Sequence, residues 1–396
     1  MSLDFNFTEE QRMLEESVSR WANDWLEPQV EECWAKQECP GGFFKELGKL
    51  GVNGVGFEEK YGGAGLGYVE TTLVAEAIGR INSGLSGTYI VNEIVCFDNI
   101  RRNAREEHRM EVLPKACSGE YIGSLGMTEP NTGSDAMSMS TTAVKRGDKY
   151  IVNGSKTFIS LSPIADVMLF YAKTEPEKGP LGMSAFWFYT KDVKGFTVDK
   201  LDKIGFRLSP TGLVTFEDVE IPAENMVGEY NNGVNVLTSG LCTERITLCG
   251  CVLGQMRSSL ELSLKYAKER VQFGKPIANF QFIQGKLADM YCDYKACKWM
   301  GYSAAAYIDS LKDKHGGKGT DLDRMAAAAV LYCGEKGTKV ALDAVQIHGG
   351  YGVCTEYAVT RDFLDAKVWE VGAGTNEIRR IVIARELLRD DFRSGN

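Results

Sequence analysis

The chain changes its hydrophobic periodicity twice, and this change constrains the fold more than any other feature of the sequence. Residues 7 to about 120 carry a helical pattern, with Leu14, Val18, Trp21 and Trp25 on one face. Residues from about 121 to 230 form short β-rich runs separated by glycine, proline and charge. From about 231 onward the helical pattern returns in longer segments. The order predicts an α+β protein with an N-terminal helical domain (1–120), a β-sheet domain (121–230) and a C-terminal helical domain (231–396).

Local signals place several elements within these regions. Thr8 and Gln11 fit a capping box at the start of the first helix. Asn153-Gly154 separates two β-rich runs, 149–152 and 157–159, and predicts the turn of a β-hairpin. The other expected elements are helices around 42–50, 68–80, 105–116, 243–270 and 326–348, strands over 165–173, 183–189 and 213–219, and loops over 58–65 and 312–323.

Composition and charge exclude several classes of function. The 396 residues carry a net charge of −9 with a pI near 5.2, so a general nucleic-acid surface is not expected. No apolar run predicts a membrane span, and the first residues lack the pattern of a signal peptide. The 11 cysteines include no C-x-x-C pair and accompany only 3 histidines, which argues against a metal site. We therefore expect a cytoplasmic protein with free thiols, in the cytosol or a comparable reducing compartment.

The glycine-rich stretches do not form a nucleotide-binding motif. Gly62–Gly67 does not fit G-x-G-x-x-G and follows no clear strand. Gly316–Thr320 is not a P-loop, because its lysine precedes the final glycine. No G-x-S-x-G sequence is present, and the few histidines leave little choice for a hydrolase triad. Turn chemistry explains these stretches best.

Three ordered motifs resemble those of the acyl-CoA dehydrogenase family. They are GMTEPNTGSD at 126–135, RVQFG at 270–274 and QIHGGYG at 346–352. The helix–strand–helix order is also that of the family, so the resemblance covers essentially the full chain. Within the family, Trp369–Thr375 and the pair Glu244-Arg245 are similar to the isovaleryl-CoA dehydrogenase branch. The resemblance implies a C-terminal four-helix bundle and FAD as the cofactor.

The resemblance also implies where the catalytic base lies. Most of the family carries a glutamate directly before a Gly-Thr pair, and here that position is Ala373, which cannot take a proton. The similar branch keeps its base at the position of Glu244, which is therefore the predicted base. The competing interpretations are ion pairs of Glu244 with Arg245 or Arg257, and a salt bridge of Glu370, the second candidate base, with Arg361 or Lys367.

By resemblance, residues from all three regions would bind FAD and the substrate. Glycines and small hydroxyl residues in 126–135 let backbone N–H groups approach a flavin ring or a phosphate. Phe158 would pack on the flavin ring, and its alternative role is ordinary sheet core. Arg270 would form bidentate hydrogen bonds with the pyrophosphate of a neighbouring subunit's cofactor. The expected cofactor-binding residues are Met127, Thr128, Gly133, Ser134, Phe158, Ser160, Arg270, Gln281, Gln346, Gly349, Gly350, Thr375 and Glu377, and the expected substrate-binding residues are Ser134, Asn235, Cys242, Arg245, Ala373 and Gly374.

The activity that the resemblance implies is FAD-dependent α,β-dehydrogenation of an acyl-CoA to the 2-enoyl-CoA. Glu244 would abstract the α-proton and flavin N5 would take the β-hydride. The base position implies a short, branched or cyclic acyl group, although Cys242, Thr243 and Asn235 depart from the branch beside the acyl pocket. An electron-transfer flavoprotein would accept the electrons, and the assembly would be a homotetramer. The alternatives are an enoyl-CoA reductase, a flavin-dependent oxidase, and a silent flavoprotein or acyl-CoA-binding scaffold.

Overall fold

A layer of helices begins the fold. The computed structural model describes residues 6–311 and 321–393. Thr8 caps α1 (Glu9–Trp21) by accepting from the Gln11 backbone N–H at 3.2 Å, and the Gln11 side chain accepts from the Thr8 backbone at 3.0 Å. The predicted capping box is therefore confirmed. The chain continues through α2 (Val30–Lys36), α3 (Phe43–Lys49), α4 (Tyr68–Gly79), α5 (Ser83–Ile90), a π-helical segment (Val91–Asp98), α6 (Asn99–Asn103) and α7 (Glu106–Cys117), with α3, α4 and α7 where the sequence predicts them.

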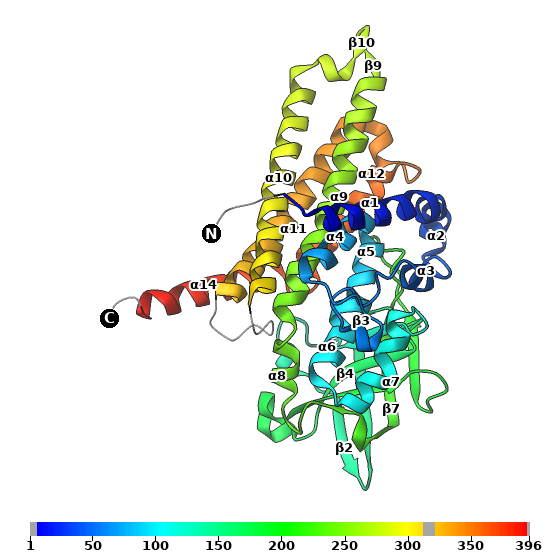
Figure 1. The fold of residues 1–396 in the computed structure, drawn as a ribbon, viewed down its shortest axis with the longest axis vertical. Coiled ribbons are helices and arrows are strands. Elements are labelled where there is room, and N and C mark those ends of the chain that lie inside the picture. Colours follow the sequence, from blue (N-terminus) through cyan, green and yellow to red (C-terminus); the bar gives the residue numbers. More distant parts are fainter. Residues whose placement is uncertain (1–5, 312–320, 394–396) are drawn as a thin grey trace.

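An 8-stranded sheet follows, with the order β6-β7-β3-β2-β4-β5-β8 and β1 paired in parallel with β4. All seven residues of β4 are buried, which explains the apolar run from Val167 to Ala172, and the Lys173 ammonium at its end donates to the Met137 and Gly179 carbonyls. The sheet lies at the opposite end of the molecule from the β9–β10 hairpin described below (Figure 1). The strands are β1 (Gly123–Gly126), β2 (Thr142–Arg146), β3 (Lys149–Ser160), β4 (Val167–Lys173), β5 (Met183–Tyr189), β6 (Phe196–Lys200), β7 (Thr211–Pro222) and β8 (Met226–Val227), so the runs predicted at 165–173, 183–189 and 213–219 are confirmed as strands.

The hairpin turn predicted at Asn153-Gly154 is wrong. β3 runs through both residues, and the turn between β2 and β3 lies earlier, at Gly147-Asp148. Gly154 has φ +142°, and the pairing of β3 with β7 shifts register at this point, as in a β-bulge. A Cβ on Gly154 would lie 2.6 Å from the Thr141 Oγ1. The glycine thus permits a close approach within a strand, and a sequence pattern does not separate this role from a turn.

Long helices form the C-terminal part. The helices predicted over 243–270 and 326–348 are confirmed, and Gly349, with φ +60°, ends the second. The predicted loop over 312–323 lies outside the described residues except at 321–323, where it is wrong, because acidic residues there begin a helix. The elements are α8 (Gly233–Thr238), α9 (Leu241–Glu269), β9 (Val271–Gln272), β10 (Lys275–Pro276), α10 (Gln281–Ser310), α11 (Asp321–His348), α12 (Ala358–Ala366), α13 (Val368–Val371) and α14 (Asn376–Arg393).

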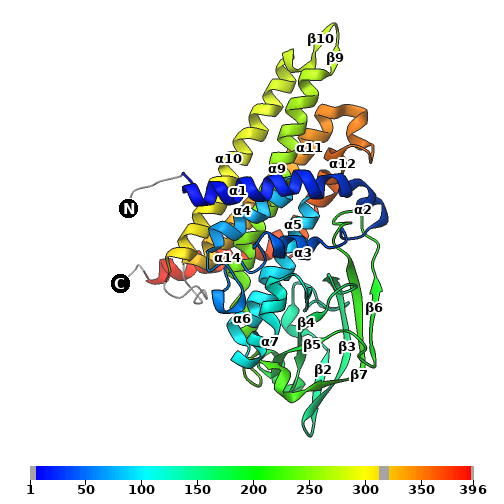
Figure 2. The same cartoon turned by 45° about the vertical axis from the view of Figure 1, so that its right-hand side comes forward.

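Helix α9 is the central element of the fold. It packs against α4, α10 and α11, and Figure 2 shows α1 lying across this bundle. Within the described residues, Gly233–Glu269 is the one helical stretch long and apolar enough to cross a membrane, but 72% of its apolar window is buried inside the fold. The burial is that of a core helix. The domain boundaries after residues 120 and 230 stay predictions.

Candidate active site

The first turn of α9 carries the predicted base. The Glu244 backbone N–H donates to the Gly240 carbonyl at 3.0 Å. Its side chain is half-buried, and no hydrogen bond or ion pair from the described residues holds its carboxylate. Burial raises the pKa of this carboxyl above the ordinary 4.5, while the guanidinium groups of Arg245, Arg379 and Arg102 act against the rise. A carboxylate with a raised pKa and vacant acceptor sites is suited to take a proton.

The ion pair considered for Glu244 and Arg257 is wrong. Arg257 instead donates to Glu15 at 2.8 Å and to Glu261 at 2.9 Å. Arg245 is 7% exposed, and its Nε lacks a hydrogen-bond partner within the described part of the chain. Arg245 therefore acts on Glu244 as a nearby charge, not as a bonded partner.

Arg379 links the Ala373 segment to Glu244. Its guanidinium is buried and donates to the carbonyls of Trp369 (2.8 Å) and Gly372 (3.0 Å), directly before Ala373. Burial lowers the pKa of Arg379 to about 10, and the charge of Glu244 acts against that decrease. Ala373 has φ +52° and is exposed. One guanidinium thus serves two segments that lie far apart in the sequence.

Glu370, the second candidate base, is occupied by a salt bridge. Its Oε2 accepts from the Lys367 Nζ at 2.7 Å, whereas Arg361 donates to the Thr355 carbonyl. Burial favours the neutral form of Glu370, but the bond from Lys367 holds its pKa below the usual range. The interpretation of Glu370 as a salt-bridge partner of Lys367 is confirmed.

The loop over 126–135 is anchored to the sheet by a buried ion pair. Glu129 accepts from the Lys156 Nζ at 2.8 Å and from the Thr141 N–H at 2.9 Å, and Lys156 is fully buried. The Thr128 carbonyl accepts from the Thr157 N–H at 2.8 Å, which fixes the loop beside β3. Two of the predicted cofactor residues on this loop, Gly133 and Ser134, are exposed, and Met127 and Thr128 are half-buried.

Phe158 does not belong to the sheet core. Its side chain is 69% exposed and its φ is +58°, an unusual conformation for a bulky residue inside a strand. The alternative role in the sheet core is therefore wrong. Ser160 lies two residues further along β3, half-buried, with its carbonyl bonded to the Ser124 hydroxyl at 2.7 Å. The strand presents an exposed aromatic ring beside the 126–135 loop.

Three of the other predicted cofactor residues share a cavity at the far end of α9. Arg270, Gly349 and Gly350 line it together with Tyr266, Tyr351 and other residues, and its volume is about 550 Å³. The Arg270 guanidinium lies 5.7 Å from the centre of the Tyr351 ring. Gln281, Gln346 and Glu377 are exposed and do not line this cavity, and the Thr375 hydroxyl accepts from the Ile378 N–H at 3.3 Å.

These features fit FAD. An exposed aromatic ring at Phe158 and the open faces of Gly133, Gly349 and Gly350, where an added Cβ would meet nothing within 4 Å, suit a flat ring and a phosphate. Arg270 supplies a guanidinium for phosphate oxygens in an otherwise largely apolar cavity.

The predicted substrate residues divide into two groups. Cys242, Glu244 and Arg245 share the first turn of α9, and the Cys242 thiol donates to the Asp323 Oδ1 at 2.8 Å. Asn235 is exposed on α8 and its side chain bonds to Asn232. The structure therefore brings Cys242 and Arg245 to the base. The segment directly before Ala373 and Gly374 is linked to it through Arg379, but the described residues give no such link for Asn235 or for Ser134.

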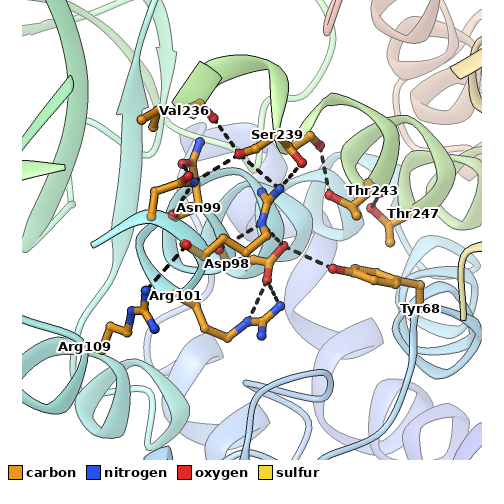
Figure 3. A network of polar contacts seen from close by, with 12 residues as sticks. Tyr68, Asp98, Asn99, Arg101, Arg109, Val236, Ser239, Thr243 and Thr247 are labelled. Carbon is orange, nitrogen blue, oxygen red and sulfur yellow. Dashed lines mark hydrogen bonds and ion pairs between the residues drawn. The ribbon is translucent and has the colours of Figure 1, made fainter. Parts of the chain in front are cut away.

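Two residues that the sequence reasoning missed, Arg379 and Arg102, act on the charge of Glu244, and a third, Asp98, holds Arg102. Arg379 is described above, and Arg102 on α6 is the third cation that acts on the base. Asp98 pairs with Arg102 at 3.0 Å and belongs to the polar network that reaches Ser239 (Figure 3). The only signal in the sequence is an acid followed by two arginines three and four residues later, which is common on helices.

Comparisons with known proteins identify the family of the chain. Family models for the N-terminal, middle and C-terminal domains of acyl-CoA dehydrogenase match residues 8–120, 124–219 and 231–388. Mitochondrial isovaleryl-CoA dehydrogenase of Pongo abelii is 42% identical over 97% of this chain and 90% of the relative. The structure of butyryl-CoA dehydrogenase from Megasphaera elsdenii has a TM-score of 0.91 at 34% identity, covering 98% and 100% of the two chains. An FAD complex of PigA has a TM-score of 0.90 at 31% identity, covering 97% and 99%. The chain belongs to the acyl-CoA dehydrogenase family and is an FAD-dependent enzyme of that class.

Proposed function

We propose that the protein dehydrogenates a short, branched or cyclic acyl-CoA to its 2-enoyl-CoA, with Glu244 taking the α-proton. The observation that carries this proposal is the arrangement around Arg379. Its guanidinium holds the segment before Ala373 and acts on the charge of Glu244, so the segments that carry the two family positions for a base share one guanidinium. Of these two positions, only Glu244 carries a side chain that can accept a proton.

The environment of Glu244 supports its role as the base. The carboxylate has no bonded partner in the described residues and remains partly accessible. Burial raises its pKa and so makes it a better proton acceptor, while three guanidinium groups oppose the rise and help to keep it ionised. Glu370 is not free for this role, because Lys367 occupies it.

The residues named above would hold FAD from two subunits. When bound, FAD supplies the hydride acceptor for the β-hydrogen. Glu244 and Arg270 stand at the two ends of α9, 26 residues apart, which is about 39 Å at a rise of about 1.5 Å per residue. That separation supports a cofactor bound by the sheet and Glu244 of one protomer and by Arg270 of its neighbour. Phe273 and Phe282 beside Arg270 are 94% and 92% exposed, as expected of an interface, and we propose a homotetramer.

The proposal also covers the acyl group of the substrate, the electron acceptor and the cellular compartment. The similarity to an isovaleryl-CoA dehydrogenase supports a branched acyl group, and an electron-transfer flavoprotein is the proposed electron acceptor. All eleven cysteines, which lie in the described part of the chain, are free thiols, and this supports a reducing compartment such as the cytoplasm.

Anaerobic titration of the purified holoenzyme tests the proposal. Isovaleryl-, butyryl-, isobutyryl-, 2-methylbutyryl- and cyclohexanecarboxyl-CoA are added in turn while the visible flavin absorbance is followed. We expect a branched or cyclic acyl-CoA to remove that absorbance most completely. Loss that reverses rapidly in air would favour an oxidase, and a flavin that responds only to reductant plus an enoyl-CoA would favour a reductase. Protein isolated without any flavin would favour the silent scaffold.

A further inference from the structure

Arg102 is a buried cation at the break between α8 and α9. Its side chain is 1% exposed, and its Nε lies 3.0 Å from the Asp98 Oδ2. The guanidinium also donates to the Ser239 carbonyl, at the end of α8, and lies 3.4 Å from the Ser239 hydroxyl. Figure 3 shows Ser239 above Asp98, which lies near the centre of this network, and the two residues come from elements far apart in the sequence. Arg102 therefore ties α6 to the start of α9.

Gly240 permits this contact. A Cβ on this residue would stand 2.4 Å from the Arg102 Nη2, closer than atoms can approach. The same Nη2 is buried and has no hydrogen-bond partner in the described residues. A buried charge with an unused donor weakens stability. The buried Arg102 guanidinium therefore lowers the stability of the fold at this position, and locally unfavourable positions of this kind often have a functional role.

A short chain of bonds leads from Arg102 to the base. Ser239 and Gly240 are held by the guanidinium, and the Gly240 carbonyl accepts from the Glu244 N–H at 3.0 Å and from the Thr243 hydroxyl at 2.9 Å. A shift of Arg102 would therefore move the first turn of α9, where Glu244 stands.

We propose that Arg102, clamped by Asp98, is a positioning residue that fixes the Ser239–Gly240 turn and thereby aims the Glu244 carboxylate at its substrate. This inference rests on the proposed role of Glu244. Arg102 acts on Glu244 in two ways, through the backbone of the Ser239–Gly240 turn and through the charge of its guanidinium.

The charge of Arg102 has a separate effect that can be measured. The charged and titratable groups that act on Glu244 are Arg245 on its own helix, Arg379 on α14 and Arg102 on α6, and the Tyr171 hydroxyl on β4 also senses its charge. Burial raises the pKa of Glu244 and the three cations lower it. Removing one cation should raise this pKa further and move the acid limb of the rate to higher pH.

Four variants of the holoenzyme separate position from charge. Arg102→Gln removes both effects, Arg102→Lys keeps the charge without the forked contact, and Gly240→Ala displaces the guanidinium but keeps every charge. Arg101→Gln is the matched control, because Arg101 lies beside Arg102 and also pairs with Asp98, at 2.6 Å, but its charge does not act on Glu244. The readouts are the limiting rate and half-saturation concentration of flavin reduction by rapid mixing, across pH. An infrared titration of the Glu244 carboxyl band, assigned by its loss in Glu244→Gln, gives its protonation without turnover.

For the three site variants we expect the limiting rate to fall about 10- to 100-fold, with acyl-CoA half-saturation within about twofold. Only Arg102→Gln should also move the acid limb and the infrared midpoint to higher pH, while Arg101→Gln should match the wild type. A Gly240→Ala rate within about twofold of wild type would overturn the inference, even if Arg102→Gln failed to fold. If Glu244→Gln itself remained active, the proposed role of Glu244 as the base would be contradicted. This outcome is distinct from the outcomes for the Arg102 and Gly240 variants, which test only the positioning role of Arg102.

Discussion

Glu76 and Glu244 stand on α4 and α9, two helices that pack together, yet their carboxylates have opposite surroundings. Glu76 is 2% exposed and accepts from the Tyr294 hydroxyl (2.7 Å), the Tyr302 hydroxyl (2.6 Å) and the Lys298 Nζ (3.0 Å). Glu244 is partly accessible, and no described residue forms a hydrogen bond or ion pair with its carboxylate. The three cations around Glu244 act through charge.

The difference shows that burial alone does not identify a base. Each carboxylate oxygen of Glu76 accepts hydrogen bonds from donors on α10, so the residue joins α4 to α10. The Glu244 carboxylate has no such donors among the described residues, and Arg379, one of the cations that act on its charge, also holds the Gly372 carbonyl. A carboxylate of the first kind stabilises the fold, while one of the second kind is free to take a proton.

The largest effect on stability is expected at Glu76. Glu76→Gln leaves the Lys298 ammonium without its buried counter-ion, and breaking such a pair costs about 3–5 kcal/mol. Thermal unfolding of the holoenzyme should show a clearly lower midpoint. The rate of flavin reduction per bound FAD should stay near the wild-type value. A variant with an unchanged midpoint would contradict the structural role given to Glu76.

The pH dependence of kcat/KM is expected to depend on Glu244 and not on Glu76. Since Glu244 must be ionised to accept a proton, kcat/KM should fall about tenfold for each pH unit below its pKa. Burial raises that pKa, so the acid limb should lie above 4.5. The limb should persist in Glu76→Gln and vanish from the residual activity of Glu244→Gln. An acid limb that persists in Glu244→Gln would assign the titration to another group.

Moving the base tests the position of the Ala373 segment. In a Glu244→Gly background, Ala373→Glu should recover about tenfold in the rate of flavin reduction. Recovery should be partial, because a carboxylate at a new position must meet the substrate within a fraction of an ångström of the productive geometry. A double variant no faster than Glu244→Gly would indicate that residue 373 does not face the substrate α-carbon.

The smallest expected effect is at Ala373 itself. Ala373→Gly relieves the left-handed backbone conformation and should raise the stability by up to about 1 kcal/mol, measured as a slightly higher melting temperature. The rate of flavin reduction should be unchanged, because the Ala373 side chain has no chemical role. A large loss of rate would show that this methyl group shapes the site.

Periodicity and capping chemistry are local, and they predicted much of the fold. The helix–strand–helix order, the capping box at Thr8 and the end of α11 before Gly349 all follow from neighbouring residues. The turn predicted at Asn153-Gly154 was wrong because the glycine serves another purpose. Thr141 packs so close to Gly154 that a Cβ would not fit there, and the local sequence pattern does not contain this contact. The domain boundaries and the roles of the site residues stay predictions.

The candidate site was predictable only where family motifs mark it. Glu244, Arg270 and Ala373 were found through resemblance, and the structure adds how they are placed. Arg102 and Arg379 were missed because their importance depends on contacts over long sequence distances, to Ser239 and to the Gly372 carbonyl. A lone arginine in a helix carries no local sign of such a contact.

Rapid-mixing measurement of flavin reduction in Glu244→Gln, using the best acyl-CoA, tests the central claim most directly. Glu370→Gln is the matched control, because it alters the competing carboxylate in the same region. We predict that Glu244→Gln retains its FAD and loses about 10²- to 10⁴-fold in rate, while Glu370→Gln stays near the wild type. A Glu244→Gln enzyme that keeps more than about a tenth of the wild-type rate would contradict the assignment of Glu244 as the base.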